Sequence, residues 1–152
     1  IGAMTGLLLC NNPPKLEYVD HIISIIVGPE VISGSTRMKA GTATKMVLNM
    51  ITTTLMIKLN KTYGNLMVDI KTGSEKSRDR ARRIVTMATG LSHEEADTLL
   101  RGARWNVKVA IVMQKTGKTY SGAASQLKKF GDSVRSAVGE DLQRSLIRRR
   151  GQ

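Results

Sequence analysis

One long helical stretch near the middle of the chain limits what the chain can fold into. From about Arg37 to Asn60, apolar side chains recur on most sides of a helical wheel and leave only a narrow polar strip. The apolar members are Met46, Val47, Met50, Ile51, Leu55, Ile57 and Leu59. A helix that is apolar on most sides is normally buried on most sides. We therefore expect a central strut of roughly 36 Å, surrounded by the rest of the molecule.

Two short apolar runs precede this helix. Residues 3–10 and 21–27 are rich in aliphatic side chains, and each run ends in turn residues, Pro13-Pro14 and Gly28-Pro29. Continuous apolar runs of this length are typical of strands in a parallel sheet that is covered on both faces. The fold class predicted for the chain is therefore α/β.

A basic helix is expected from about Ser74 to Thr89. Ser74 is a plausible N-cap, because its hydroxyl can accept a bond from the free N–H groups of the first turn. The predicted apolar face consists of Ala81, Ile84, Val85 and Ala88. The predicted basic residues on the rest of the helix are Arg78, Arg80, Arg82 and Arg83.

A weak internal repeat with a period of 27 residues follows this basic helix. One copy starts at Thr89 and the other at Thr116, and Leu100 aligns with Leu127. Each copy reads as a helix, a short turn and a second helix, with the glycine of the Thr-Gly pair as a helix stop. We expect small paired helices that depend on their neighbours for stability.

The net charge of +12 is unevenly distributed. Residues 1–70 hold six of the 24 cations and four of the 12 acids, so residues 71–152 carry +10 of the total. Such a surface could attract nucleic acid, but only 3% of the residues are aromatic and could stack on bases. The alternative, a solvated helical face, is favoured, and nucleic acid is not the expected partner.

The sequence contains no run of about 18 apolar residues, so no membrane span is expected. The start of the chain does not resemble a secretion signal. Its single cysteine, Cys10, cannot form an internal disulfide, which fits a reducing compartment. The first residue is Ile1 rather than methionine, which leads us to expect a fragment of a longer protein.

The segment before the long helix, GPEVISGSTRMKAGTATK at residues 28–45, is the strongest candidate for a binding site. Ser35 and Thr36 could donate hydrogen bonds, and Arg37 and Lys39 place two cations at the positive end of the helix dipole. That placement suits a bound phosphate or carboxylate held by free backbone N–H groups and the two cations. The alternative is a capped core helix whose cations point to water.

Glu30 follows the Gly28-Pro29 turn, where open α/β sheets bind ligands. Its carboxylate could orient a sugar hydroxyl or accept a proton. Alternatively, it pairs with Arg37 or Lys39 at the surface.

The other motifs in the sequence do not indicate a functional site. His21 and His93 lack ligand spacing, no CxxC or HExxH pattern occurs, and neither a metal nor another cofactor is predicted. The sequence Gly117-Lys118-Thr119 is like the end of a P-loop, but residue 112 is valine where the first glycine should be.

Three segments, 28–45, 63–71 and 106–117, resemble the N-acetylmuramic acid 6-phosphate etherases in order and spacing. The Gly-Ser-Thr-Arg-Met-Lys block at 34–39 is also similar to the glucokinase regulatory protein, which binds sugar phosphates without catalysis. The resemblance implies a sugar isomerase-type (SIS) α/β domain followed by a small all-α helical domain. It also implies a cytoplasmic homodimer with its active site near the subunit interface.

The resemblance further implies a carbon–oxygen lyase that needs no metal or nucleotide. Such an enzyme removes a proton from C2 of the sugar, expels D-lactate from C3 and adds water to the unsaturated intermediate. The products would be N-acetylglucosamine 6-phosphate and D-lactate, as in the recycling of cell-wall sugars. The substrate class would be a phosphorylated amino sugar.

The family's catalytic glutamates and main phosphate-binding loop would lie upstream of Ile1, so no residue here is assigned a catalytic role. The expected domains are the end of the SIS domain at 1–62, a helical domain at 63–139 and a basic tail at 140–152. Substrate-binding residues would be Glu30, Ser35, Thr36, Arg37 and Lys39. The isolated chain should be inactive and poorly stable, because one apolar face of the long helix and a sheet edge would be uncovered. Two alternatives are a non-catalytic sugar-phosphate sensor and a basic nucleic-acid binder.

Overall fold

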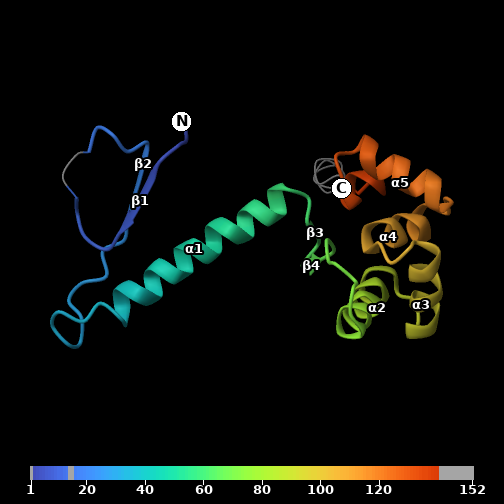
Figure 1. Cartoon of the computed structure of the whole chain (residues 1–152), viewed down its shortest axis with the longest axis horizontal. Coiled ribbons are helices and arrows are strands. Elements are labelled where there is room, and N and C mark those ends of the chain that lie inside the picture. The colour runs from blue at the N-terminus through green and yellow to red at the C-terminus, as the bar shows by residue number, and fades with distance from the viewer. Residues whose placement is uncertain (1, 14–15, 141–152) are drawn as a thin grey trace, which may run out of the picture. The chain divides into compact units, whose positions relative to one another are not determined.

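The structure is a computed structural model that describes residues 2–13 and 16–140. Over these ranges the chain contains two two-stranded sheets and six helices (Figure 1), so the mixed α/β class expected from the sequence is confirmed. The backbone divides into two compact units, Ile1–Leu55 and Met56–Gln152. The tail expected at 140–152 falls almost wholly outside the described residues.

The first unit contains a parallel pair of strands. β1 (Gly6–Leu9) and β2 (His21–Ser24) pair in register along their whole length (Figure 1), which confirms the predicted parallel arrangement. Both strands are shorter than the apolar runs suggested. The carboxylate of Asp20 accepts hydrogen bonds from the backbone N–H of Thr5 at 2.7 Å and from its hydroxyl at 2.9 Å. These bonds tie the starts of the two strands together.

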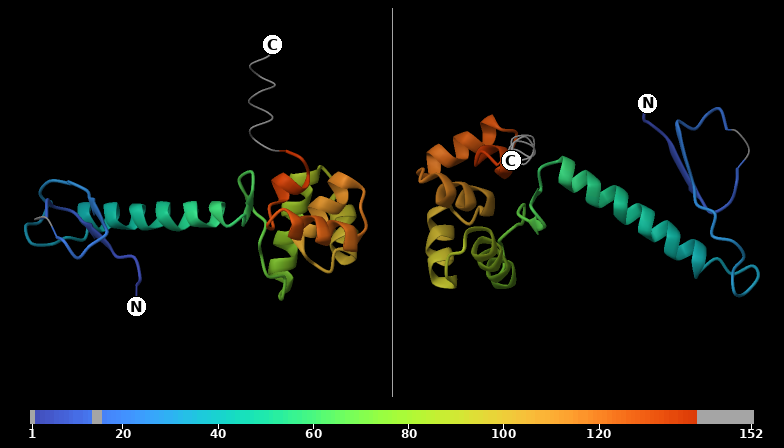
Figure 2. Two further views of the ribbon diagram at one scale, coloured as in Figure 1. Left: turned by 90° about the horizontal axis from the view of Figure 1, so that it is seen from above. Right: turned by 180° about the vertical axis from the view of Figure 1, so that it is seen from behind.

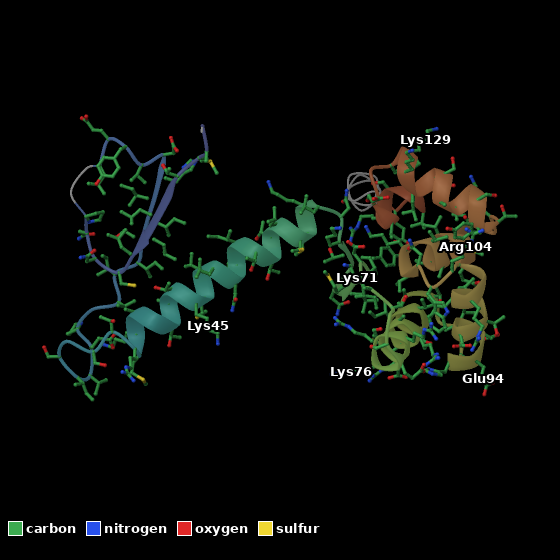
Figure 3. The ribbon with its side chains drawn as sticks, viewed as in Figure 1. Lys45, Lys71, Lys76, Glu94, Arg104 and Lys129 are labelled. Carbon is green, nitrogen blue, oxygen red and sulfur yellow. The ribbon has the colours of Figure 1, made fainter. Side chains whose placement is uncertain are left out.

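The long helix α1 (Lys39–Lys58) lies within two residues of its predicted bounds. It ends because Asn60 adopts φ 55°, a left-handed conformation that asparagine tolerates, and the N–H of Lys61 then bonds to the carbonyl of Met56. None of its residues is buried, so the expected central, enclosed strut is wrong for this chain. Its side chains project on all sides of the helix (Figure 3), with Met46 and Met50 58% and 57% exposed. Two four-residue strands offer too little apolar surface to cover a 20-residue helix.

The second unit begins with a small antiparallel hairpin, β3 (Thr62–Tyr63) and β4 (Leu66–Met67), which sequence patterns did not predict. Gly64 takes φ 58° at the first turn position, a conformation available to glycine without steric cost. Five helices follow: α2 (Glu75–Thr89), α3 (His93–Gly102), α4 (Val107–Thr116), α5 (Tyr120–Lys129) and α6 (Val134–Ala137).

Capping residues fix the ends of these helices, and three of them, Ser74, Gly90 and Gly117, are predicted from the sequence. Ser74 and Ser92 both cap their helices in reciprocal capping boxes, with Ser77 and Glu95 as the respective partners. Gly90 and Gly117 end α2 and α4 in the left-handed conformation. The predicted apolar face of α2 is confirmed: Ala81, Ile84 and Val85 are buried, and Ala88 packs against the core.

All fully buried hydrophobic side chains among the described residues lie between Val68 and Ala137. Helix α4 is central to this core, because it contacts α2, α3, α5 and α6 (Figure 2). Its residues 107–112 are all buried. Lys108 is the one buried charged residue among them, and its ammonium donates to the backbone carbonyl of Asp132 at 3.2 Å. The hydrophobic stability of the described chain is therefore concentrated in the helical unit.

The two copies of the 27-residue pattern have matching backbone turns. Between α3 and α4, Arg104 and Trp105 have φ of 52° and 61°; between α5 and α6, Gly131 and Asp132 have φ of 59° and 61°. A Cβ atom disfavours the left-handed conformation, and three of these four residues carry one, so such consecutive pairs are uncommon. Their recurrence 27 positions apart gives both helix pairs the same reversal.

Hydrogen bonds join the beginning of the helical unit to its end. The hydroxyl of Tyr63 donates to the carboxylate of Glu140 at 2.7 Å, and the ammonium of Lys115 donates to the same carboxylate at 3.0 Å. The side-chain amide of Asn60 donates to the carbonyl of Gly131 at 3.0 Å. The hairpin, α4 and the segment after α6 are thus held at one corner of the unit.

Candidate functional site

The start of α1 is occupied by a carboxylate of the protein itself. Glu30, nine residues before the helix begins, accepts a hydrogen bond from the backbone N–H of Lys39 at 3.1 Å and one from that of Ala40 at 3.0 Å. The N–H groups of the first helical turn have no partner inside the helix. Glu30 therefore acts as an N-terminal cap delivered from the preceding loop. The expectation that these two N–H groups are free for a ligand is wrong.

The electrostatics of this cap are those of an anion at a positive helix end. The N–H groups of Ala40 and Lys39 hold the pKa of the Glu30 carboxyl below its usual value, against a smaller opposing effect of burial. Glu30 is therefore ionised at neutral pH and is engaged by the backbone, which makes it a poor candidate for accepting a proton from a substrate.

The two cations of the segment behave differently. The ammonium of Lys39 donates to the carbonyl of Pro29 at 2.8 Å, which ties the side chain back onto the loop that carries Glu30. The side chain of Arg37 is exposed and makes no recorded hydrogen bond or ion pair with the described residues. The backbone N–H of Ser35 donates to the carbonyl of Ile32 at 3.1 Å and closes a turn.

A shallow pocket of about 350 Å³ opens beside this cap, within the volume range of small-molecule sites. It brings together Glu30 and Thr36, whereas Ser35, Arg37 and Lys39 do not line it. The remaining lining residues are Cys10, Asn11, Val27, Gly28 and Ala40.

Cys10 and Asn11 are lining residues that the sequence argument missed. Both directly follow β1, and the carboxyl ends of parallel strands are where such sheets bind ligands. That rule, applied to Glu30 after the second strand, could have identified them after the first. The thiol of Cys10 lies 3.7 Å from both the carbonyl of Ala40 and the hydroxyl of Thr44, so it packs against the first turn of α1.

The pocket presents a carboxylate, a hydroxyl, an amide and a thiol. Such a set can orient the hydroxyl and amide groups of a ligand. The side chain of Arg37 lies in the same segment and, unlike that of Lys39, is available to bind an anion. Within 2–13 and 16–140, no group of three or more histidine, cysteine or acidic side chains could hold a metal ion. The same part of the chain contains no helix long and apolar enough to cross a membrane.

No protein-family model matches the chain. Curated proteins do match it, and the three described here share one name. The chain is 51% identical over 140 residues to an N-acetylmuramic acid 6-phosphate etherase of Rubrobacter xylanophilus, covering 91% of this chain and 46% of that protein. It is 48% identical over 139 residues to one of Alkaliphilus metalliredigens, with 91% and 45% covered. For one of Caldanaerobacter subterraneus the identity is 55% over 114 residues, with 74% and 37% covered.

The chain thus spans about half the length of the curated relatives it matches. The match with the Rubrobacter xylanophilus protein covers 91% of the chain, so it includes all three segments that carried the resemblance. By sequence, the chain is a relative of the N-acetylmuramic acid 6-phosphate etherases over about half of their length.

Proposed function

We propose that this chain is one half of an etherase subunit that cleaves the D-lactyl ether of N-acetylmuramic acid 6-phosphate. The single observation that carries the proposal is the 51% identity with the Rubrobacter xylanophilus etherase over 91% of the chain. The other half of the subunit would supply the catalytic acids and the remaining strands of an SIS-type sheet. The proposed assembly is a cytoplasmic homodimer.

The segment before α1 would form one wall of the sugar-phosphate site. Arg37 would meet the phosphate or the lactyl carboxylate, because its guanidinium is uncommitted and can bind such groups through two parallel hydrogen bonds. Ser35 and Thr36 would donate hydrogen bonds to the sugar. Glu30 and Lys39 would act mainly by fixing the loop against α1, through the contacts to Ala40 and Pro29.

A hybrid enzyme tests this proposal. In the Rubrobacter xylanophilus etherase, the segment of 140 matched residues is replaced by this chain, and release of D-lactate from N-acetylmuramic acid 6-phosphate is measured. We expect the hybrid to release D-lactate and the 152-residue chain alone to release none. In the hybrid, R37Q should lower kcat/KM about 100-fold, the loss of about two charge-assisted hydrogen bonds.

The matched control is K129Q, which removes one exposed cation from α5 in the helical unit. It should leave kcat/KM within twofold of the parent hybrid. A folded hybrid that binds the substrate but releases no D-lactate would contradict the etherase proposal. Equal losses in R37Q and K129Q would contradict the role of Arg37.

A second candidate function is a sugar-phosphate sensor without catalysis. It is favoured by the Glu30 cap, since the one acid among the described lining residues is already held by two backbone N–H groups. Binding of N-acetylmuramic acid 6-phosphate by the folded hybrid, with no product over many hours, would support this sensor.

A further inference from the structure

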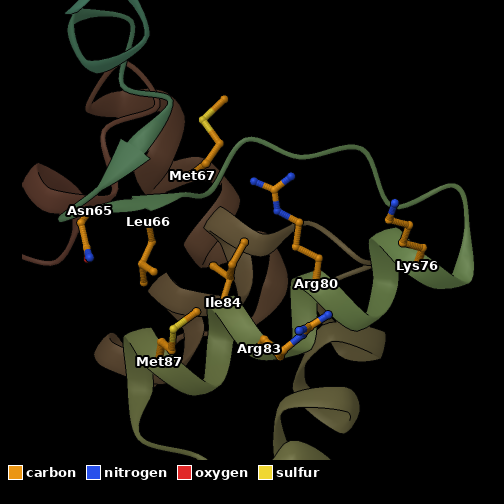
Figure 4. A pocket seen from close by; sticks show the side chains of 8 residues that line it. All are labelled: Asn65, Leu66, Met67, Lys76, Arg80, Arg83, Ile84 and Met87. Atoms are coloured by element: carbon orange, nitrogen blue, oxygen red, sulfur yellow. The ribbon is translucent and has the colours of Figure 1, made fainter. Parts of the chain in front are cut away.

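We propose that a pocket between the β3–β4 hairpin and α2 binds a small phosphate monoester with an apolar substituent. The pocket has a volume of about 480 Å³ and belongs wholly to the helical unit (Figure 4). The proposal does not depend on the etherase function, because none of its residues lies in the segment before α1.

Three cations line the pocket along one face of α2. Lys76, Arg80 and Arg83 are spaced by four and three residues, which places them on the same side of a helix. Figure 4 shows the three cations on α2, followed further along the helix by Ile84 and Met87, while Leu66 and Met67 come from the hairpin. None of the described residues that line the pocket is acidic, so none of them neutralises the cations.

The cations of α2 divide into those that stabilise the fold and those that do not. The guanidinium of Arg82 bonds to Asp97 at 2.6 Å and to Glu75 at 2.7 Å. Arg78 stacks over the ring of Trp105 at 4.8 Å, and Arg83 pairs with Asp79 at 2.5 Å.

Lys76 and Arg80, by contrast, have no recorded carboxylate or aromatic partner among residues 2–13 and 16–140. Two unneutralised cations one helical turn apart match the charge of a phosphate monoester, about −1.5 to −2 at neutral pH. A carboxylate would neutralise only one of them. Arg83, already paired with Asp79, completes the rim without adding net charge.

The remaining wall of the pocket is apolar. Leu66 and Met67 contribute from β4, and Ile84 and Met87 from α2. Met87 is 63% exposed although it adjoins this apolar surface, so a ligand could cover it. Asn65, in the hairpin turn, adds one amide that can donate to an ester oxygen. An anionic head with an apolar body therefore fits both halves of the pocket.

Nucleic acid is disfavoured as the occupant. Base binding relies on exposed aromatic faces, and the lining residues within 2–13 and 16–140 include no aromatic side chain. The single tryptophan of the chain, Trp105, is already covered by Arg78 and Arg82.

The test is calorimetric titration of the full chain with phenyl phosphate, inorganic phosphate and a single-stranded oligonucleotide at two salt concentrations. We expect saturable binding of phenyl phosphate, tighter than that of inorganic phosphate. K76Q/R80Q should weaken it at least tenfold, because two charge-assisted hydrogen bonds are lost. The matched control K128Q/K129Q removes two exposed cations from α5 and should change the affinity less than twofold.

Met87→Ser provides an independent readout of the apolar wall. It should reduce the preference for phenyl phosphate over inorganic phosphate about threefold and leave inorganic phosphate binding unchanged. Circular dichroism verifies that each variant is folded, as expected for changes at exposed positions.

Three results would overturn the proposal: no saturable binding of phenyl phosphate, equal losses in both double variants, or an oligonucleotide that binds more tightly through Lys76 and Arg80. The last would identify a nucleic-acid surface.

Discussion

At the scale of single residues, Glu30 decides how the candidate site is understood. The sequence offered two interpretations of this acid, one as a ligand-binding group and one as a partner for Arg37 or Lys39. The structure gives a third arrangement, in which its carboxylate bonds to the backbone N–H groups of Lys39 and Ala40. Sequence alone could not predict it, because the loop that brings residue 30 back to residue 39 has no periodic pattern.

Glu30→Gln should weaken the start of α1 at neutral pH, because the amide lacks the charge that interacts with the helix dipole. The pKa of Glu30 is lowered in the fold, so its stabilising contribution is complete above the ordinary value of 4.5 and is lost as the pH falls below it. Backbone amide shifts of Lys39 and Ala40, followed by NMR between pH 7 and pH 2, should titrate in the parent chain and not in the variant.

Glu17→Gln is the control for Glu30→Gln, since Glu17 is an exposed acid of the same unit that bonds to neither amide. In Glu17→Gln, the amide shifts of Lys39 and Ala40 should change with pH as they do in the parent chain. Unchanged titration in Glu30→Gln would show that another group caps α1 in solution.

At the scale of elements, local signals were sufficient for the helices and insufficient for the strands. Ser74, Gly90 and Gly117 predicted helix ends because each acts on backbone groups within a few residues. The β3–β4 hairpin was missed because two-residue strands are too short to show an alternating pattern. The strands predicted at 3–10 and 21–27 are too long, because the apolar residues of each run extend beyond the residues that pair.

Gly90→Ala should destabilise the helical unit by about 1 kcal/mol. Gly90 has φ 79° at the end of α2, and a Cβ atom is disfavoured there. Gly73→Ala is the control, because Gly73 lies just before α2 without a positive φ and has open space where its Cβ would be. Urea unfolding followed by the fluorescence of the single tryptophan, Trp105, measures both. Equal stabilities for the two variants would contradict this account of the cap.

At the scale of the whole chain, the exposure of α1 is the main difference between the expected fold and the observed one. The apolar pattern of Met46, Met50 and Ile51 was identified correctly, but burial depends on surfaces that lie elsewhere in space. The helical unit supplies the core found among the described residues, and β1 and β2 supply little. The apolar pattern shows that α1 can pack against other apolar surfaces, but it does not show whether this chain supplies such surfaces.

Rates of amide hydrogen exchange should therefore differ strongly between α1 and the helical unit. Amides of α1 should exchange at least 100-fold faster than those of α4, because α1 has no buried residue and helices in proteins gain most of their stability from packing. Mass spectrometry at two protein concentrations measures this and detects any protection due to self-association. In the hybrid etherase, α1 should become as protected as α4. Equal protection of both helices in the dilute chain alone would contradict the exposed state of α1.

The bond between Tyr63 and Glu140, 77 residues apart, has a practical consequence. Since the entry and exit of the helical unit meet at one carboxylate, the segment from Tyr63 to Glu140 has the geometry of a cassette. It could be transplanted into a surface loop of an unrelated host with little distortion of the host backbone.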